Sequence, residues 1–202
     1  INKLLFVQPL RYSEDIDLVQ TIAEPIGPTV NSIRQALSWL GHCKVSQAGH
    51  SIHLLFKFEA ESDQREVLKL KVEINTREHK SLLGVFDYPF SMASSWHKAE
   101  TNISSFRPEE LLGTKLRALL QRQKNRDLFD LSEALEKLPV EPDTILACCD
   151  HYLSIEGSNI SRAEAEQRML KKLSRSLTED VGPLLPNGIG FSETDALSAF
   201  AK

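Results

Sequence analysis

Two aspartates near the start of the chain have the residue type and spacing of a metal-binding pair. Asp15 and Asp17 are separated by one residue at the entrance of a short apolar segment. Residues two apart on a β-strand point to the same face, so both carboxylates would project together. Like charges side by side repel unless a cation lies between them, and magnesium prefers hard oxygen ligands together with substrate phosphates. The pair alone is weak evidence, because aspartates in loops are mostly solvated.

A third carboxylate, Glu73, strengthens this interpretation and leaves two alternatives open. Glu73 lies in a run that alternates apolar and polar residues, on the same face as Lys71. Lysine and glutamate often alternate on the solvent-facing side of a strand, which would give Glu73 no special role. Alternatively, Glu73 lies on a strand adjacent to the aspartate pair, and the three acidic groups would hold one or two divalent ions.

Lys115 is the candidate cation in the second half of the chain. Leu111, Leu112 and Leu119 place it on the apolar stripe of a predicted helix. Such a lysine either extends its ammonium group past the stripe into water or points it at the phosphates of a bound nucleotide.

Basic residues then precede two aspartates, Asp127 and Asp130, at the start of the next predicted helix. The basic residues are Arg122, Lys124 and Arg126. Aspartate is favoured at a helix N-terminus, so one alternative is a solvated turn that leads into the helix. The other is that the three cations form a local phosphate-binding patch.

The elements that would position these residues are mixed in the first half of the chain. Strict alternation of apolar residues predicts strands, and apolar residues at helical spacing predict a helix. The expected elements are a strand at 16–22, a helix at 29–40, strands at 52–58 and 68–74 joined by a turn at 62–65, and a strand within 82–90 that Pro89 interrupts.

The second half of the chain is predicted to be helical. The expected helices span 109–121, 127–138, 143–155 and 162–177, with proline and glycine residues between them. A change of pattern near residues 104–108 separates a sheet-containing domain at 1–106 from a helical domain at 107–202. The predicted fold class is α+β, in which a mixed sheet with flanking helices precedes a helical C-terminal domain.

The composition is that of a globular protein and excludes several classes. The 202 residues are 41% hydrophobic and 26% charged, with a net charge of −4, which argues against a broad non-specific nucleic-acid binder. No run reaches the roughly 18 apolar residues of a membrane span, and no secretory leader is visible. We therefore expect a cytoplasmic protein without membrane contact. Cys43, Cys148 and Cys149 fit neither a disulfide framework nor a four-ligand zinc site, and reduced thiols are expected.

Three segments resemble the AbiEii/AbiGii family of abortive-infection toxins. They are R-Y-S-E-D-I-D at 11–17, K-V-E-I-N-T-R-E at 71–78 and E-E-L-L-G-T-K-L-R-A-L-L-Q-R-Q-K-N-R-D-L-F-D-L at 109–131. The last segment is the most distinctive, because the Ser-x-Asp-x-Asp element alone recurs in many polymerase-like transferases. The resemblance implies a nucleotidyltransferase fold in the toxin of a two-gene, type IV toxin–antitoxin system.

The resemblance also implies a role for each matching residue. The expected catalytic residues are Asp15, Asp17, Lys115 and Asp127. The expected nucleotide-binding residues are Ser13, Arg11, Arg77, Lys115 and Asp130. The expected ligands of Mg²⁺ or Mn²⁺ are Asp15, Asp17 and Glu73. Asp127 either orients Lys115 or accepts the proton of the acceptor, and both roles stay open.

The function implied by the resemblance is metal-dependent transfer of a nucleotide from an NTP to an acceptor. The implied acceptor is RNA, namely the 3′ end of tRNA, and the result is growth arrest during phage infection. An antitoxin protein, a DNA-binding repressor encoded by the neighbouring gene, is the implied partner. Two alternatives remain: a catalytically impaired module that binds nucleotide or RNA, and a hydrolase in which water replaces the acceptor.

The sequence departs from the family pattern at one point. Related nucleotidyltransferases carry a Gly-Gly or Gly-Ser element shortly before the aspartate pair, and its backbone N–H groups bind phosphate. This sequence begins with Ile1-Asn2-Lys3-Leu4-Leu5, which is typical of the helix that follows such an element. The expectation is therefore that the N-terminus is truncated, and the activity of this chain would depend on the missing glycines.

Overall fold

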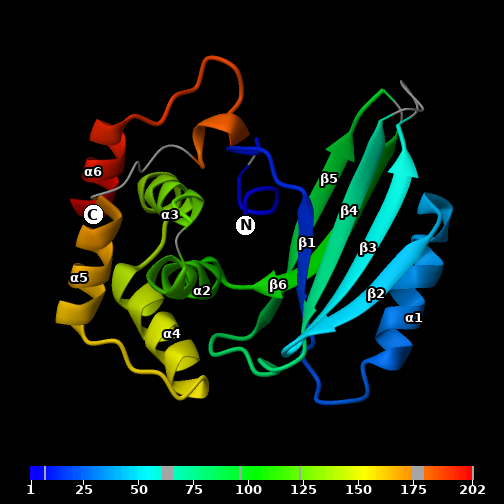
Figure 1. The fold of residues 1–202 in the computed structure, drawn as a ribbon, viewed down its shortest axis with the longest axis horizontal. Helices are drawn as coiled ribbons and strands as arrows, with labels where there is room; N and C mark the ends of the chain where they lie inside the picture. Colours follow the sequence, from blue (N-terminus) through cyan, green and yellow to red (C-terminus); the bar gives the residue numbers. More distant parts are fainter. Residues whose placement is uncertain (7, 61–65, 96, 123, 174–179, 202) are drawn as a thin grey trace. The chain divides into compact units, whose positions relative to one another are not determined.

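The computed structural model describes residues 1–6, 8–60, 66–95, 97–122, 124–173 and 180–201, and Figure 1 shows its elements. The chain divides into two compact units. The sheet unit is Glu14–Ser81, and the helical unit is Ile1–Ser13 together with Leu82–Lys202. The predicted α+β fold class is confirmed, with a mixed sheet and a series of helices in the C-terminal half. The division into domains at 1–106 and 107–202 stays a prediction.

The sheet unit is built on a four-stranded mixed sheet. Its strands are β1 (Asp15–Val19), β2 (Cys43–Ala48), β3 (Ser51–Glu59) and β4 (Val67–Asn75). Their order across the sheet is β1-β4-β3-β2 (Figure 1). β1 runs parallel to β4, whereas the other neighbouring strands are antiparallel. β1 is therefore an edge strand of this sheet, paired along its length with β4.

One face of this sheet holds the core of the unit. Apolar residues alternate along β3 and β4, so they all point to one side. The helix α1 (Gly27–Ala36) and the 3₁₀ turn η1 (Ser38–Leu40) pack on that side through Ile26, Val30, Ile33 and Leu37. The buried residues of this core are Leu40, Ile52, Leu54, Phe56, Val72 and Ile74. The opposite face consequently carries the polar residues of the same strands.

The helical unit packs its helices around a second core. Its helices are α2 (Pro108–Gln121), α3 (Arg126–Lys137), α4 (Pro142–Ile155), α5 (Arg162–Leu173), η2 (Gly182–Leu184) and α6 (Glu193–Ala201). The main core contains Leu112, Leu119, Leu128, Leu131, Ala134, Ile145, Ala196 and Ala199. At Gly113 a Cβ atom would lie 2.6 Å from Cys148 Cβ and 2.9 Å from Ile145 O, so only glycine allows α2 and α4 to approach this closely.

The helical unit also contains a two-stranded antiparallel sheet. It consists of β5 (Val85–Ala93) and β6 (Lys98–Phe106), with Pro89 opposite Asn102. The expected interruption at Pro89 is wrong, because β5 continues to Ala93. Proline lacks the N–H of a sheet ladder and is tolerated where a strand has an open edge, as in a two-stranded sheet.

Most of the predicted elements are confirmed within a few residues. The strands at 52–58 and 68–74 are β3 and β4, and the strand at 16–22 is β1, which ends earlier, at Val19. The helix at 29–40 is α1 followed by η1. The helices at 109–121, 127–138, 143–155 and 162–177 are α2 to α5, and the last is described as far as Leu173. The predicted turn at 62–65 lies outside the described residues.

Four of the described elements were not predicted, and one expected helix is not observed. The strands β2 and β6, the 3₁₀ turn η2 and the helix α6 were missed. Residues 1–5 form hydrogen-bonded turns, in which Leu4 N and Leu5 N donate to Ile1 O, in place of the expected helix. A single turn has few of the backbone hydrogen bonds that offset the cost of starting a helix.

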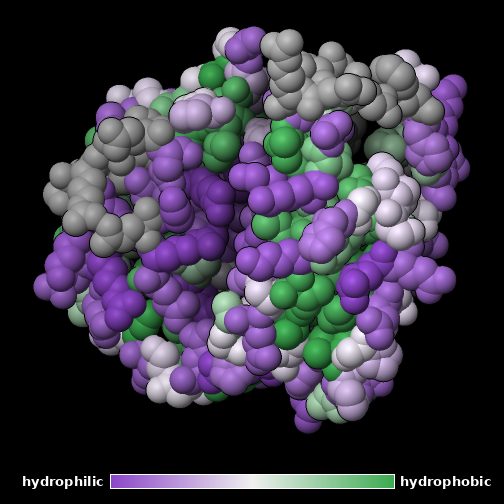
Figure 2. Space-filling model, turned by 45° about the vertical axis from the view of Figure 1, so that its right-hand side comes forward, coloured by the Kyte–Doolittle hydropathy of each residue, from purple (hydrophilic) through white to green (hydrophobic). Residues whose placement is uncertain are grey.

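The surface in Figure 2 is largely hydrophilic, with smaller hydrophobic areas between the polar side chains. In the part of the chain that the structure describes, no helix is long and apolar enough to span a membrane. Cys43, Cys148 and Cys149 are free thiols.

Candidate functional site

The polar face of the sheet unit brings together Asp15, Asp17, Lys71 and Glu73. We call these four residues the β1–β4 cluster. The parallel register sets Asp15 opposite Lys71 and Asp17 opposite Glu73. Because residues in register point to the same side of a sheet, all four side chains lie on the face opposite α1. The prediction that Glu73 is on a strand adjacent to the aspartate pair is confirmed by this pairing.

The local sequence explains why this arrangement forms. On the other side of the same strands, Ile16 lies opposite Val72 and Leu18 opposite Ile74. Val72 and Ile74 are buried in the core beneath α1. A shift of one residue would bring the carboxylates to the core side, so burial of these apolar residues fixes the register.

Lys71 links the carboxylates of the β1–β4 cluster. Its Nζ lies 2.8 Å from Glu73 Oε2 and 3.7 Å from Asp15 Oδ2. The hydrogen bond to Glu73 raises the pKa of Lys71 against the opposing effect of burial, and the charges of Glu73, Asp15 and Asp17 raise it further. Lys71 is therefore a protonated cation among three carboxylates at neutral pH.

Glu73 has a second basic neighbour, His53, on β3. His53 Nε2 lies 3.5 Å from Glu73 Oε1. Burial acts to raise the pKa of Glu73, but the hydrogen bond from Lys71 and the positive charge beside it outweigh this effect and lower the pKa. Sequence reasoning did not single out His53, although it alternates with the apolar residues of the predicted strand and therefore faces the same side as Glu73.

The chemistry of this cluster suits a divalent cation bound with a ligand. Asp15 and Glu73 retain 38% and 32% side-chain exposure, so their oxygens are accessible. Within the described ranges, no group of three or more His, Cys, Asp or Glu side chains is already arranged to hold a metal ion. Magnesium commonly needs only one or two protein carboxylates, because water and substrate phosphates supply the remaining ligands. The donor set therefore fits an ion that arrives with a nucleotide.

The helical unit contains a second cluster of charged residues, in which the two aspartates are buried. We call Arg11, Lys115, Arg122, Asp127 and Asp130 the α2–α3 network. Lys115 Nζ lies 2.6 Å from Asp130 Oδ2 and 3.2 Å from Asp127 Oδ1. Lys115 therefore joins the two aspartates from the facing helix α2.

Each aspartate of this network also binds an arginine through both carboxylate oxygens. Arg11 Nε and Nη2 are each 2.7 Å from Asp130, and Arg122 Nε and Nη2 are 2.9 and 3.0 Å from Asp127. Burial acts to raise the pKa of Asp130, but Arg11 and Lys115 outweigh it and hold the pKa below its usual range. The Asp127 and Asp130 side chains are 0% and 2% exposed, whereas Lys115 keeps 17%. The network thus fixes a lysine whose ammonium group remains partly accessible.

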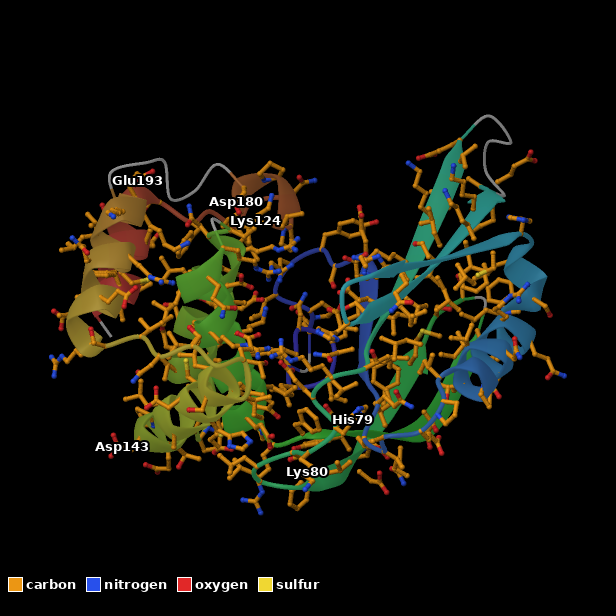
Figure 3. All side chains as sticks on the ribbon, turned by 60° about the horizontal axis from the view of Figure 1, so that its bottom comes forward. His79, Lys80, Lys124, Asp143, Asp180 and Glu193 are labelled. Atoms are coloured by element: carbon orange, nitrogen blue, oxygen red, sulfur yellow. The ribbon has the colours of Figure 1, made fainter. Side chains whose placement is uncertain are left out.

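The turn between α2 and α3 is held by contacts from the C-terminal segments. Asn125 N, before the first turn of α3, donates to Asp180 Oδ2 at 2.9 Å. Figure 3 shows Lys124 and Asp180 near each other at this end of α3. Lys172 Nζ donates to Arg122 O. Burial lowers the pKa of Lys172, and Asp127 and Asp180 act in the opposite direction. Basic residues therefore gather at the turn that carries the predicted phosphate patch.

Ser13 and Arg77, two of the predicted nucleotide-binding residues, lie in loops. The backbone oxygen of Ser13 accepts a hydrogen bond from Lys3 Nζ at 3.3 Å. Arg77 is exposed after β4, and its backbone N donates to Asn75 Oδ1 at 2.9 Å. Arg11, in contrast, is buried in the α2–α3 network, as described above. The predicted roles of Ser13, Arg77 and Arg11 in nucleotide binding stay predictions.

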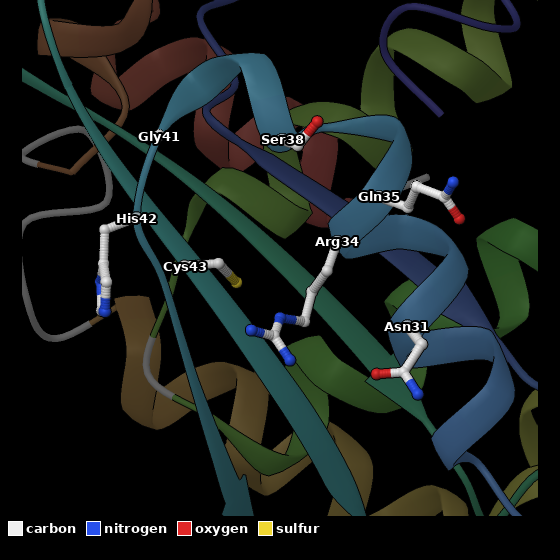
Figure 4. A pocket seen from close by; sticks show the side chains of 7 residues that line it. All are labelled: Asn31, Arg34, Gln35, Ser38, Gly41, His42 and Cys43. Atoms are coloured by element: carbon white, nitrogen blue, oxygen red, sulfur yellow. The ribbon is translucent and has the colours of Figure 1, made fainter.

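A cavity in the sheet unit lies apart from the β1–β4 cluster. In the sheet unit, a cavity of about 420 Å³ is lined by Asn31, Arg34, Gln35, Ser38, Gly41, His42 and Cys43. Arg34 extends its guanidinium group toward the space between Asn31 and Cys43 (Figure 4). Burial raises the pKa of the Cys43 thiol, and Arg34 opposes this effect. None of the predicted site residues lines this cavity.

Comparison with known families identifies the class of protein. A family model described as "Nucleotidyl transferase AbiEii toxin, Type IV TA system" matches residues 2–197. The protein is therefore of the nucleotidyltransferase class. The chain belongs to the AbiEii family, whose members are toxins of type IV toxin–antitoxin systems. No curated protein and no solved structure matches the chain.

Family membership gives the general function of the chain. It implies transferase activity toward a nucleotide and an antitoxin as partner. The match to the family model extends over both units, so it includes both the β1–β4 cluster and the α2–α3 network.

Proposed function

We propose that this protein transfers a nucleotide from an NTP to a hydroxyl group of RNA, and that the acceptor is the 3′ end of tRNA. The observation that carries the proposal is the register of β1 with β4, which gathers Asp15, Asp17 and Glu73 on one accessible face. Three carboxylates on one face are costly without a cation, and Lys71 supplies one positive charge beside them. A divalent ion bound with an NTP would balance their charge.

In this proposal, the β1–β4 cluster binds Mg²⁺ or Mn²⁺. Asp15 and Asp17 would hold the ion, and Glu73 would complete the set of oxygen donors. When bound, such an ion polarises the α-phosphate and neutralises charge on the leaving pyrophosphate. A bond forms between the acceptor oxygen and the α-phosphorus, and the bond from that phosphorus to the bridging oxygen breaks. The acceptor proton passes to a carboxylate of the cluster or to water.

Lys115 would stabilise the negative charge of the NTP phosphates. Its ammonium group is fixed by two buried carboxylates and is still partly accessible. A charge held in position before the reaction needs no reorganisation when charge develops on the leaving group. Asp127 is fully buried and bound by both Lys115 and Arg122, which favours its role in orienting Lys115 over a role as proton acceptor.

The remaining predicted residues would support these roles. Asp130 and Arg11 would hold Lys115 in place through their paired contacts. Ser13 and Arg77 would contact the nucleotide from the loops that flank the sheet. We further propose that the protein acts in the cytoplasm and that an antitoxin from the neighbouring gene restrains it.

The test is nucleotide labelling. The purified protein is incubated with each radiolabelled NTP, Mg²⁺ and total tRNA, and label in RNA is measured. We expect one or more NTPs to label RNA, and we expect Asp15→Ala and Asp17→Ala to abolish the signal. Asp143→Ala is the matched control, because Asp143 is an exposed aspartate in the first turn of α4 (Figure 3).

Each result distinguishes between the possible functions. Labelling that persists in both cluster variants would show that the assigned site is wrong. Nucleotide binding without labelling would favour a binding module of the same fold, and release of phosphate without labelling would favour a hydrolase.

A further inference from the structure

The polar face of the sheet unit carries lysines beside the β1–β4 cluster. We call Lys44 on β2, Lys57 on β3 and Lys69 on β4 the lysine face. Lys57 lies directly opposite Lys69, and Lys44 and Lys71 both lie opposite Leu55, from either side of β3. The register therefore places all these lysines on the face that also carries Asp15 and Asp17.

Charge is separated along this face. The acidic groups lie on β1 and the adjoining part of β4, and Lys71 marks the boundary. Beyond Lys71 the face becomes basic, where Lys69 and Lys57 follow. On the same face of β3, the carboxylate of Glu59 follows Lys57 by two residues. Each of Lys44, Lys57 and Lys69 is exposed, and none forms an ion pair with another residue that the structure describes.

The pairing of Lys57 with Lys69 is unfavourable by itself. Side chains directly opposite on antiparallel strands have Cβ atoms about 5 Å apart, and like charges at that distance destabilise a sheet. A row of phosphates bound to the lysines would remove this repulsion. The nearby carboxylates would repel the same phosphates unless a divalent ion covers them, so the two halves of the face suit different parts of one ligand.

The geometry points to a nucleic-acid backbone as that ligand. Lys69 precedes Glu73 by four residues, which is about 13 Å along a strand, at about 3.3 Å per residue. A strand that ends with its 3′ hydroxyl at the acidic part of the face would therefore place its preceding phosphates over Lys69 and Lys57. In the described strands of this face the registers place no Phe, Tyr or Trp, so bases would have no aromatic surface on which to stack.

We propose that the lysine face binds the phosphate backbone of the acceptor RNA just before its 3′ end. This inference rests on the proposed transferase function and assigns the acceptor-binding surface for it. Contacts to phosphates position a strand without reading its sequence. Binding to the lysine face is therefore independent of base sequence and falls with rising salt concentration.

The test uses a fluorescein-labelled single-stranded RNA and the full chain. Fluorescence anisotropy gives the affinity from 50 to 200 mM salt for the wild type and for the double variant Lys57→Gln/Lys69→Gln. Each phosphate contact contributes about 0.7 to the slope of log affinity against log salt for a single strand, so we expect the slope to fall by about 1.4. Affinity at the lowest salt should fall about tenfold or more, equally for oligo(A) and oligo(U).

The control is Lys80→Gln/Lys98→Gln, which removes the same charge from two exposed lysines outside this face. We expect it to lower RNA affinity far less than the double variant. Unchanged RNA affinity in Lys57→Gln/Lys69→Gln, or an equal loss in the control, would overturn the inference.

Nucleotide binding separates this inference from the proposed function. Calorimetry with Mg²⁺ and an NTP should give the same affinity for Lys57→Gln/Lys69→Gln as for the wild type. A loss of NTP affinity with unchanged RNA affinity would show that the lysines bind the triphosphate, which also overturns the inference. The anisotropy experiment measures RNA binding and does not depend on nucleotide transfer. A failure of the labelling assay would therefore contradict the transferase proposal, and the anisotropy experiment would still test RNA binding by the lysine face.

Discussion

The β1–β4 cluster and the α2–α3 network contain the same kinds of residue and differ in burial. In the β1–β4 cluster, the carboxylates of Asp15 and Glu73 are about one-third exposed, and Lys71 lies beside them. In the α2–α3 network, Asp127 and Asp130 are buried, and each binds an arginine and shares Lys115. The first has oxygens that a ligand can reach. In the second, both carboxylates are buried and already paired with lysine and arginine.

This difference separates binding from positioning. An accessible acidic cluster can bind and release a metal–nucleotide complex, because water competes for the same oxygens. The buried carboxylates of Asp127 and Asp130 cannot lose their partners without leaving a charge unpaired, which is costly. Substitutions in the β1–β4 cluster should therefore affect activity, and substitutions of the buried Asp127 and Asp130 should affect stability first.

The largest expected effect is on the rate of nucleotide transfer. Asp15→Asn or Asp17→Asn should lower this rate about 1,000-fold, which corresponds to about 4 kcal/mol of transition-state stabilisation. The labelling assay measures the rate, and urea denaturation should show a change within about 0.5 kcal/mol in the free energy of unfolding, as for surface residues. A cluster variant with reduced activity and greatly reduced stability would show that the two regions do not differ in the way proposed.

The next effect is a loss of stability in the α2–α3 network. Asp130→Asn leaves Arg11 and Lys115 buried with one carboxylate fewer, so the free energy of unfolding should fall by about 3 kcal/mol. Urea denaturation measures this change. Glu73→Gln is the comparison, because the partly exposed pair of Glu73 and Lys71 should contribute no more than about 1 kcal/mol. Equal losses in both variants would remove the distinction between the regions.

The stability that Asp130 contributes should depend on pH. The pKa of Asp130 is lower in the folded protein than its ordinary value, which is about 3.9 in unfolded chains. The unfolded state therefore binds the proton more readily, and stability decreases as the pH falls below about 4. The difference in unfolding free energy between the wild type and Asp130→Asn should be complete at pH 7 and should shrink through this acidic range. A difference that stays constant between pH 6 and pH 3 would contradict this assignment.

The smallest effect is expected at Glu73. Glu73→Gln removes the negative charge of one carboxylate and the ion pair of that carboxylate with Lys71. The carboxylates of Asp15 and Asp17 remain. We expect about a tenfold lower rate, equivalent to about 1.4 kcal/mol, and weaker dependence on Mg²⁺ concentration. An effect as large as that of Asp17→Asn would make Glu73 an essential metal ligand, and no effect would assign it only to the pairing with Lys71.

The part of the fold that the sequence could predict is the part in which one side of an element is buried. β3 and β4 alternate apolar and polar residues because one face packs beneath α1, so period-two reasoning found them. β2 and β6 are largely exposed on both sides and therefore leave no apolar period to detect. Pro89 was taken as a break, because sequence gives no information on which strands have an open edge.

The candidate site was predictable to a similar extent. Alternation placed Glu73 and Lys71 on the polar face of a strand, and the adjacency of that strand to Asp15 and Asp17 was one of two alternatives. The contact of Arg11 with Asp130 was not predictable, because 119 residues separate them and no local pattern records such a pairing. The structure places Arg11 in a buried ion pair with Asp130, and its expected role in nucleotide binding stays a prediction.

Metal-dependent nucleotide binding is the most direct test of the central claim. Calorimetry with a non-hydrolysable NTP, with and without Mg²⁺, compares the wild type with Asp15→Asn and Asp17→Asn. We predict that Mg²⁺ raises the affinity of the wild type at least about tenfold, equivalent to about 1.4 kcal/mol, and that both variants lose this gain. Variants that keep the full gain from Mg²⁺ would contradict the assignment of the metal–nucleotide site to the accessible face of the sheet.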